Sequence, residues 1–290
     1  MSEANPHFID AADLAARLGA PELRIIDASW YLPTQNRNAE AEYNCARIPG
    51  AVRFDLDAVA DKTTSLPHML PAAEEFAAAV GAMGISEHDA LVVYDGPGLF
   101  SAARVWWALR TMGARNVRIL EGGFDRWKAA GLPVETGMPQ PLKHARFKPS
   151  FDASRVAAID VIRANVHNAR ALILDARPQG RFTGAVPEPR AGLRSGHVPG
   201  SISVPADSLV ENGTLKNIKE LKKIFEAVSV DASRPVITSC GSGVTAAIIS
   251  LALESIGHAN HSLYDGAWAE WGQAEDAPVA RWETPAEPKL

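Results

Sequence analysis

The sequence predicts an α/β fold of two tandem copies of one domain, each a twisted parallel sheet with helices on both faces. First, short apolar segments alternate with helical stretches along the chain, which is the pattern of a parallel sheet covered by helices. Second, four segments of the first half recur in the same order in the second half, which indicates a duplicated domain. At 290 residues the chain is long enough for two domains of ordinary size.

The repeated segments include the apolar runs expected to form strands and the turns that follow them. The pairs are residues 23–27 (LRIID) with 172–175 (LILD), 48–51 (IPGA) with 198–201 (VPGS), 91–95 (LVVYD) with 236–240 (VITSC), and 121–127 (EGGFDRW) with 265–271 (DGAWAEW). The strands of each copy are therefore expected to meet in one sheet, with the turns along one edge.

The expected helices and a linker also fit a chain divided into two copies of one domain. Residues 72–83 and 101–112 have helical composition and end next to a glycine, which commonly terminates a helix. A further helix is expected from about Ser154 to His167. Residues 137–150 (GMPQPLKHARFKPS) are rich in Pro and Lys and lack periodicity, as is typical of a linker. We therefore expect domain 1 over residues 1–137, a linker over 138–150 and domain 2 over 151–290.

Composition and charge narrow the classes of function. A hydrophobic content of 47% and a charged content of 22% are typical of a soluble globular protein, and a net charge of −5 argues against a nucleic-acid partner. The sequence contains neither a membrane-spanning apolar run nor a signal or transit peptide pattern. Two cysteines suit a reducing compartment, so we expect a cytoplasmic protein without a membrane partner. No metal-ligand spacing or phosphate loop is present, so we expect no metal and no cofactor.

Cys240 is the candidate nucleophile. It stands at the first position of a Gly-Ser-Gly turn, between a predicted strand (235–239) and a predicted helix (244–253). Backbone N–H groups and the positive end of a helix dipole favour a thiolate at such a position. Gly241 and Gly243 let the backbone approach whatever is bonded to the sulfur, and successive N–H groups form a nest for an anion. The alternative is an inert buried thiol, which the position and the loop composition oppose.

The residues around this loop argue against a neighbouring chemistry and against a second active site. A phosphatase of the C-x5-R kind needs an arginine six residues after its cysteine, but Ala246 occupies that position and the loop has no Lys or Arg. In the first copy Asp95 stands at the position of Cys240, and the loop after it is one residue longer. Because a carboxylate cannot replace a thiol, we expect domain 1 to be non-catalytic and to cover the site. Thr245 is expected to hold the loop to the start of the helix.

A set of motifs between roughly Phe8 and Ala280 points to one family. The motifs are RIPGAVRFDLDAV, HMLP, RVWWALR, EGGFDRW, GRFTG, PEPR, GHVPG, CGSGVTA and YDGAWAEW. With them the chain resembles the tandem-domain sulfurtransferases, the family of rhodanese (thiosulfate sulfurtransferase) and 3-mercaptopyruvate sulfurtransferase. The resemblance implies two rhodanese-like domains, an active site at their interface and a persulfide carried on Cys240.

The cysteine loop bears on the sulfur donor. Family members that prefer the thiosulfate dianion tend to carry basic residues in this loop, whereas CGSGVT resembles the 3-mercaptopyruvate enzymes. We therefore expect sulfur to pass from 3-mercaptopyruvate through Cys240 to cyanide or to a thiol acceptor such as thioredoxin or a small thiol, with release of pyruvate, in a monomer. The alternatives are a thiosulfate:cyanide sulfurtransferase and a persulfide carrier module without donor turnover of its own.

The resemblance also implies which residues hold the substrate. It assigns the α-keto acid to Arg181 of GRFTG and Arg190 of PEPR, whose planar forks match a carboxylate. Two solvated surface arginines are the alternative interpretation, and Arg194 is a nearby reserve candidate. The loop residues expected to bind the transferred group are Gly241, Gly243, Val244 and Thr245.

Proton handling is implied to involve a serine–histidine–aspartate relay. The matching residues are Ser242 in the loop, His68 in PHMLP and Asp57 in FDLD. A histidine can shuttle protons near neutral pH, and an aspartate can fix its tautomer. The alternative is an ordinary loop histidine and a turn or capping aspartate. Cys45 is expected to pack or to lie exposed without reacting, and a regulatory disulfide is a lesser alternative.

Overall fold

The computed structural model describes residues 5–140, 142–231 and 233–282, and within them it contains two five-stranded parallel sheets. In spatial order the first sheet consists of β1 (Phe8–Ile9), β5 (Val117–Leu120), β4 (Ala90–Tyr94), β2 (Leu23–Asp27) and β3 (Val52–Arg53). The second consists of β6 (Val156–Ala157), β12 (His261–Tyr264), β11 (Val236–Ser239), β7 (Leu172–Asp175) and β8 (Ile202–Ser203). The two orders match strand for strand, so the sheets have the same topology, as the sequence repeat predicts.

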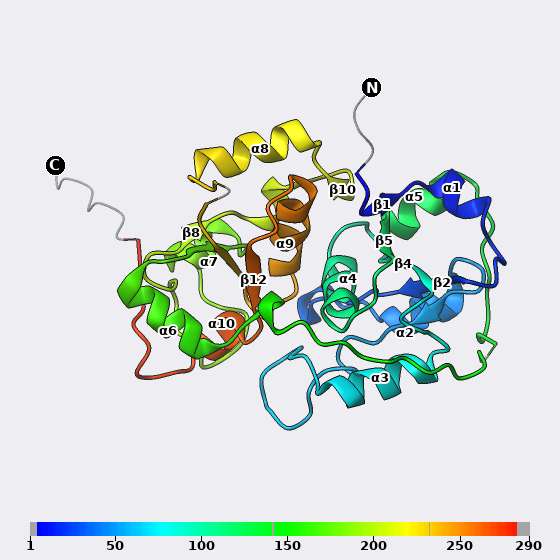
Figure 1. Ribbon diagram of the computed structural model, residues 1–290, viewed down its shortest axis with the longest axis horizontal. Helices are drawn as coiled ribbons and strands as arrows, with labels where there is room; N and C mark the ends of the chain where they lie inside the picture. The colour runs from blue at the N-terminus through cyan, green and yellow to red at the C-terminus, as the bar shows by residue number, and fades with distance from the viewer. Residues whose placement is uncertain (1–4, 141, 232, 283–290) are drawn as a thin grey trace.

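Helices cover both sheets (Figure 1). In the first half they are α1 (Ala11–Ala15), α2 (Ala39–Cys45), α3 (Ala73–Ala82), α4 (Ser101–Thr111) and α5 (Gly123–Ala129), with a 3-10 turn η1 (Pro33–Gln35). In the second half they are α6 (Ile159–Asn168), α7 (Gln179–Thr183), α8 (Ile218–Ala227), α9 (Ala246–Ser255) and α10 (Ala267–Trp271), with 3-10 turns η2 (Ala153–Arg155) and η3 (Ala206–Ser208).

Most predicted elements form close to their expected bounds, and one begins later. The helices expected over 72–83, 101–112 and 244–253 are α3, α4 and α9. The helix expected from about Ser154 begins only at Ile159, because η2 and strand β6 occupy the preceding residues and β6 pairs with β12. Residues 142–150 contain no helix or strand, and Phe147 packs against Phe76 of α3 with ring centroids 5.9 Å apart.

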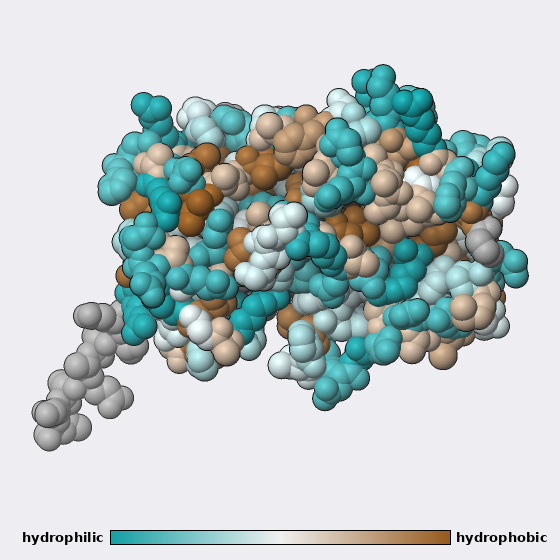
Figure 2. All heavy atoms as spheres, turned by 90° about the horizontal axis from the view of Figure 1, so that it is seen from below, coloured by the Kyte–Doolittle hydropathy of each residue, from teal (hydrophilic) through white to brown (hydrophobic). Residues whose placement is uncertain are grey.

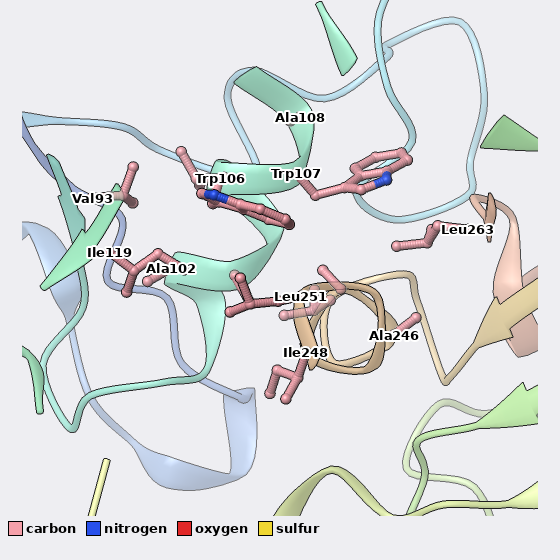
Figure 3. Close-up of a cluster of buried hydrophobic side chains, with 14 of the residues drawn as sticks. Val93, Ala102, Trp106, Trp107, Ala108, Ile119, Ala246, Ile248, Leu251 and Leu263 are labelled. Atoms are coloured by element: carbon pink, nitrogen blue, oxygen red, sulfur yellow. The ribbon is translucent and has the colours of Figure 1, made fainter. Parts of the chain in front are cut away.

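The two halves meet through α4 and α9, which lie side by side at the centre of the molecule (Figure 1). Every residue of α9 from Ala246 to Leu253 is buried, because its own sheet covers one side and α4 covers another. Such a helix needs apolar residues on all its faces. Figure 3 shows Trp106 and Trp107 on α4, and Leu251 on the side of α9 that is turned toward α4.

Five buried tryptophans fill the cores of the two halves. Trp106, Trp107, Trp127, Trp268 and Trp271 are all at most 1% exposed. In four of the five the indole N–H donates to a backbone carbonyl, for example Trp106 to Val117 at 3.2 Å and Trp271 to Pro278 at 2.8 Å. The rings therefore fill the core without leaving those N–H groups unpaired.

A two-stranded hairpin that the sequence did not predict adds a second contact between the halves. It consists of β9 (Val210–Glu211) and β10 (Thr214–Leu215), antiparallel to each other. Its turn contains Gly213, which has φ +73° and lies so close to the first half that a Cβ would be 2.6 Å from the carbonyl oxygen of Pro97. The hairpin thus packs on the loop that follows β4.

The described residues contain no helix with the length and apolar character needed to cross a membrane. On the face shown in Figure 2, hydrophilic residues are spread widely, and apolar residues lie between them in small groups.

Replacing Gly213 by alanine tests the hairpin contact, with Gly50 as a matched control. Both have nearly the same backbone conformation (φ +73° and +74°), but a Cβ on Gly50 would have no atom within 4 Å. We expect Gly50→Ala to lower the free energy of unfolding by about 1 kcal/mol through the left-handed backbone alone. Gly213→Ala should cost roughly 2–4 kcal/mol, because the clash with Pro97 adds to that strain. Denaturant unfolding of the two variants measures the difference, and equal losses would contradict the contact.

Candidate active site

Cys240 lies at the carboxyl end of β11, directly after Ser239, and its side chain is buried with 1% exposure. Residues 241–245 then lead into α9, with Gly243 at φ +78°. Two N–H groups at the start of α10 fix the loop: Trp268 donates to the carbonyl of Cys240 at 2.8 Å and Ala269 to that of Gly241 at 3.0 Å. The carbonyls of the loop are thus tied back, and its N–H groups stay available for an anion.

The corresponding loop of the first half shows what such N–H groups can do. The carboxylate of Asp95, which is 1% exposed, accepts hydrogen bonds from the backbone N–H groups of Gly98, Phe100 and Ala102, each at 2.9 Å. A buried negative charge is costly unless it is paired or hydrogen-bonded, and here the loop backbone solvates it. In the second half, within the described residues, the N–H groups of residues 241–245 form no hydrogen bond. That loop is therefore free to solvate an anion on Cys240.

Thr245, which is expected to hold the loop to the start of the helix, forms no side-chain cap there. It occupies the N-cap position of α9 with a helical backbone (φ −76°, ψ −17°), and its side chain makes no capping hydrogen bond. An N-cap residue normally needs an extended backbone to turn its oxygen toward the helix N–H groups. Thr245 instead lines the cavity beside Cys240.

A cavity of about 400 Å³ opens over the sulfur, and both halves of the chain line it. From the first half come apolar residues of two loops: Trp30, Leu32, Leu99 and Phe100. From the second half come loop and motif residues, among them Arg181, Arg190, Asp207, Val210, Cys240, Gly241, Ser242, Val244 and Thr245. Gly243 lies outside this lining, and its Cα faces Arg104 of α4 instead.

The two predicted arginines converge on this cavity. The Nη2 atom of Arg181 lies so close to Gly241 that a Cβ there would be only 2.8 Å from it. A glycine at that position therefore allows the guanidinium to approach the cysteine loop. Burial, and next the charge of Arg181, lower the pKa of Arg190. Two cationic groups thus share one wall of the cavity, as a site for an anionic substrate requires.

A buried carboxylate holds Arg181 in place. Glu188, with a side chain 1% exposed, accepts hydrogen bonds from Arg181 and also from Nη1 of Arg177 at 2.8 Å. Arg177 in turn pairs with Asp175 at 2.7 Å at the end of β7. Glu188 and Arg177 were not among the predicted site residues, although Glu188 is part of the PEPR motif. The sequence does offer one indication of Glu188, which is a carboxylate placed between Arg181 and Arg190.

The relay residues also come together. His68 is buried, with Nδ1 3.1 Å from Oγ of Ser242 and Nε2 3.1 Å from Oδ1 of Asp57. The hydrogen bond from His68 is the main cause that lowers the pKa of Asp57. The Trp30 indole donates to the other carboxylate oxygen at 2.8 Å and packs edge-on against the imidazole, with centroids 4.8 Å apart. Trp30 was not predicted, because it belongs to no motif that identified the site.

The backbone of His68 adopts the left-handed conformation, with φ +61°. A non-glycine residue there stores strain of order 1–3 kcal/mol, and such strain tends to occur at functional sites. The surrounding contacts must therefore hold His68 in this conformation.

Two other candidates lie elsewhere. Arg194, the reserve candidate, donates hydrogen bonds to the carbonyls of Trp271, Gly272, Ala274 and Ala277. It therefore stabilises the chain after α10 and does not line the cavity. Cys45 is exposed at the end of α2, and both cysteines are free thiols. In the part of the chain that the structure describes, no group of three or more His, Cys, Asp or Glu residues is arranged to hold a metal ion.

Comparison with known proteins gives consistent matches. The model of the rhodanese-like domain matches residues 10–130 and 159–274. The chain is 45% identical to 3-mercaptopyruvate sulfurtransferase of Escherichia coli strain K12 over 94% of its own length and 97% of that protein. It is 42% identical to thiosulfate sulfurtransferase of Bos taurus, over 92% and 90% of the two chains. The crystal structure of SseA, a 3-mercaptopyruvate enzyme from Escherichia coli, superposes with a TM-score of 0.84 at 44% identity, over 90% of this chain and 98% of that one.

The buried carboxylate in the first loop predicts a specific pH dependence of stability. Burial raises the pKa of Asp95 from 3.8 to about 7, although the three N–H donors act in the opposite sense. Between these values the folded chain binds a proton that the unfolded chain does not, so the stability falls as the pH rises from about 4 to 7 and then levels off. The full loss is about 4 kcal/mol.

Asp95→Asn removes this titration. The amide can change the free energy of unfolding by an amount that does not depend on pH. This amount does not affect how the difference between wild type and variant changes across pH 4–8. We expect the wild type to lose stability relative to the variant with rising pH. A difference that stays constant, or that grows in favour of the wild type, would show that the N–H donors outweigh burial.

Proposed function

This chain belongs to the rhodanese family of sulfurtransferases, and from that premise we propose that it transfers sulfur from 3-mercaptopyruvate to a thiol acceptor through a persulfide on Cys240. The observation that carries the proposal is one cavity that holds a buried cysteine, an N–H cradle and two arginines. The cysteine and cradle suit a sulfur anion, and the arginines suit the carboxylate of a keto acid.

In the first half-reaction, the Cys240 thiolate attacks the thiol sulfur of 3-mercaptopyruvate. An S–S bond forms and the C–S bond breaks, and its electron pair passes to carbon as the enolate of pyruvate. The proton of the substrate thiol ends on that carbon, which leaves pyruvate and an anionic persulfide. His68 and Ser242, 3.1 Å apart, stand beside the loop to move this proton, and Asp57 orients the imidazole.

In the second half-reaction, a thiolate acceptor attacks the outer sulfur of the persulfide. A new S–S bond forms on the acceptor, the bond to Cys240 breaks, and the cysteine returns as a thiolate. Thioredoxin or a small thiol is the acceptor that we propose, and cyanide can replace it and leave as thiocyanate.

The first half supplies the cover of the site and no nucleophile, because Asp95 stands at the position of Cys240. We therefore propose a division into a non-catalytic domain (1–137), a linker (138–150) and a catalytic domain (151–290). One chain completes the cavity, which supports a monomer as the working unit. Two free thiols, one of them a nucleophile, favour the reducing environment of the cytoplasm.

Thiosulfate is the second candidate donor. Relatives that are 41–42% identical are named as thiosulfate or thiosulfate/3-mercaptopyruvate sulfurtransferases, and two neighbouring arginines can bind an anion of either kind. The absence of Lys and Arg from the cysteine loop favours 3-mercaptopyruvate. The ratio of kcat/KM for the two donors decides between them.

Incubation with 3-mercaptopyruvate tests the reaction directly. We expect release of pyruvate and a mass increase of about 32 Da on Cys240, since one sulfur atom is added to the thiolate. Cys240→Ser should lose both signals, because a hydroxyl cannot carry the sulfur, while Cys45→Ser should keep both. Intact-protein mass spectrometry and a pyruvate assay measure the outcome. Turnover by Cys240→Ser would contradict the nucleophile, and a kcat/KM that favours thiosulfate would contradict the donor.

Removal of one arginine tests how the donor is held. Arg190→Met should raise the KM for 3-mercaptopyruvate about tenfold to a hundredfold, because a charged hydrogen bond to the carboxylate is worth about 1.5–3 kcal/mol. The KM for the acceptor should stay unchanged. Arg170→Met is the control, because Arg170 lies exposed beyond the end of α6. A donor KM equal to that of the control would contradict a binding role for Arg190.

A further inference from the structure

Arg104 is a buried arginine of α4 that the proposed reaction does not yet use. Its side chain is 1% exposed, and its guanidinium lies 4.4 Å from the centre of the Trp107 ring. Its Nη2 atom donates both to the carbonyl oxygen of His68, at 2.5 Å, and to Oδ1 of Asp265, at 2.6 Å. Arg104 therefore joins the relay histidine to the segment between β12 and α10 in the other half of the chain.

The partners of Arg104 extend this connection on both sides. The second oxygen of Asp265 accepts the backbone N–H of Leu70 at 2.8 Å, so Asp265 holds the segment after His68 as well. On its other side the guanidinium lies against the cysteine loop, where a Cβ on Gly243 would be 3.0 Å from Nη1. One side chain thus touches the backbone of His68 and the backbone of the loop that carries Ser242.

The polar groups of Arg104 are not fully satisfied. Within the described residues, its Nε and Nη1 atoms are buried without a hydrogen-bond partner. A buried charge kept with unpaired donors calls for an explanation beyond stability. The contact with His68 offers one, since that residue has the left-handed backbone (φ +61°) that its surroundings must maintain.

We propose that Arg104 is a positioning residue for the sulfur-transfer reaction. It holds His68 in its left-handed conformation, so that Nδ1 faces Ser242, and it fixes the cysteine loop at Gly243. This inference rests on the function proposed above, because it gives Arg104 a role through the proton relay.

A purely structural connection between the halves would be a different role, and the same helix supplies a control for it. Arg110, also on α4, pairs across the two halves with Glu254 at 3.1 Å and approaches Nδ1 of His7 at 3.3 Å. Arg104 and Arg110 therefore both connect α4 to a carboxylate of the second half, but only Arg104 contacts His68.

A mutant cycle tests the proposal with Arg104→Met, His68→Asn, the double variant and Arg110→Met. We expect Arg104→Met to lower kcat for pyruvate release at least tenfold, with the donor KM within threefold of wild type. Because Arg104 acts through His68, the double variant should be within twofold of His68→Asn alone. Arg110→Met should stay within twofold of wild type. Multiplicative losses in the double variant, or equal losses in Arg104→Met and Arg110→Met, would overturn the proposal.

A second measurement needs no donor and therefore separates this proposal from the proposed function. The NMR signals of the His68 ring nitrogens should shift in Arg104→Met and stay in place in Arg110→Met. If wild type releases no pyruvate from 3-mercaptopyruvate, the proposed donor fails, and the NMR comparison still decides on Arg104. Unchanged His68 signals in Arg104→Met would overturn its role. Should Arg104→Met fail to fold, Arg104→Lys, which keeps the charge on a shorter side chain, runs the same comparison.

Discussion

The site depends on a buried place where backbone N–H groups can solvate a negative charge. In the loop after β11, the carbonyls of Cys240 and Gly241 accept N–H groups of α10, while the N–H groups of residues 241–245 form no hydrogen bond within the described residues. In the first half a loop of the same kind holds a carboxyl group, because Asp95 accepts hydrogen bonds from three N–H groups of its own loop. One loop geometry thus serves two chemistries. In the first half it is permanently filled by a side chain, and in the second it is open to a sulfur anion.

The duplication explains why the cavity lies between the halves. Because α9 is buried from Ala246 to Leu253, it needs an apolar cover on the side away from its sheet, and α4 of the first half supplies that cover. The same packing brings the loop after β4 and the segments around Trp30 and His68 against the cysteine loop. The first half, which has Asp95 in place of a thiol, therefore provides the apolar wall of the cavity and the histidine beside Ser242. The interface between the halves is therefore part of a buried core that both halves share, and it also bounds the cavity.

The sequence predicted the features whose signals are local. Cys240, its glycine loop and the strands β2, β4, β7 and β11 are contiguous segments, and the repeat between the halves indicated the common topology. The arginines and the relay came from motif resemblance, and the structure brings their side chains to one site. The sequence did not predict Glu188 as the partner of Arg181, Trp30 as the donor to Asp57, or the β9–β10 hairpin. Two of these are pairings of side chains, and the hairpin has only two residues in each strand, so periodicity carries no signal for them. Thr245 makes no side-chain cap at the start of α9, because the loop keeps a helical backbone there.

The charges around the cavity bear on the choice of donor. Arg177 and Arg181 form ion pairs with the buried carboxylates of Asp175 and Glu188, whereas Arg190 forms no ion pair within the described residues. Asp207 adds a carboxylate to the lining. A substrate with one carboxylate and a ketone matches this arrangement, in which Arg190 forms no ion pair within the described residues and the charge of Arg181 is partly neutralised by Glu188. A dianion would keep more of its charge uncompensated against this wall than a keto acid would, and the cysteine loop adds no positive charge because it has no Lys or Arg. Electrostatic balance, and not the shape of the cavity alone, therefore favours the keto acid over thiosulfate.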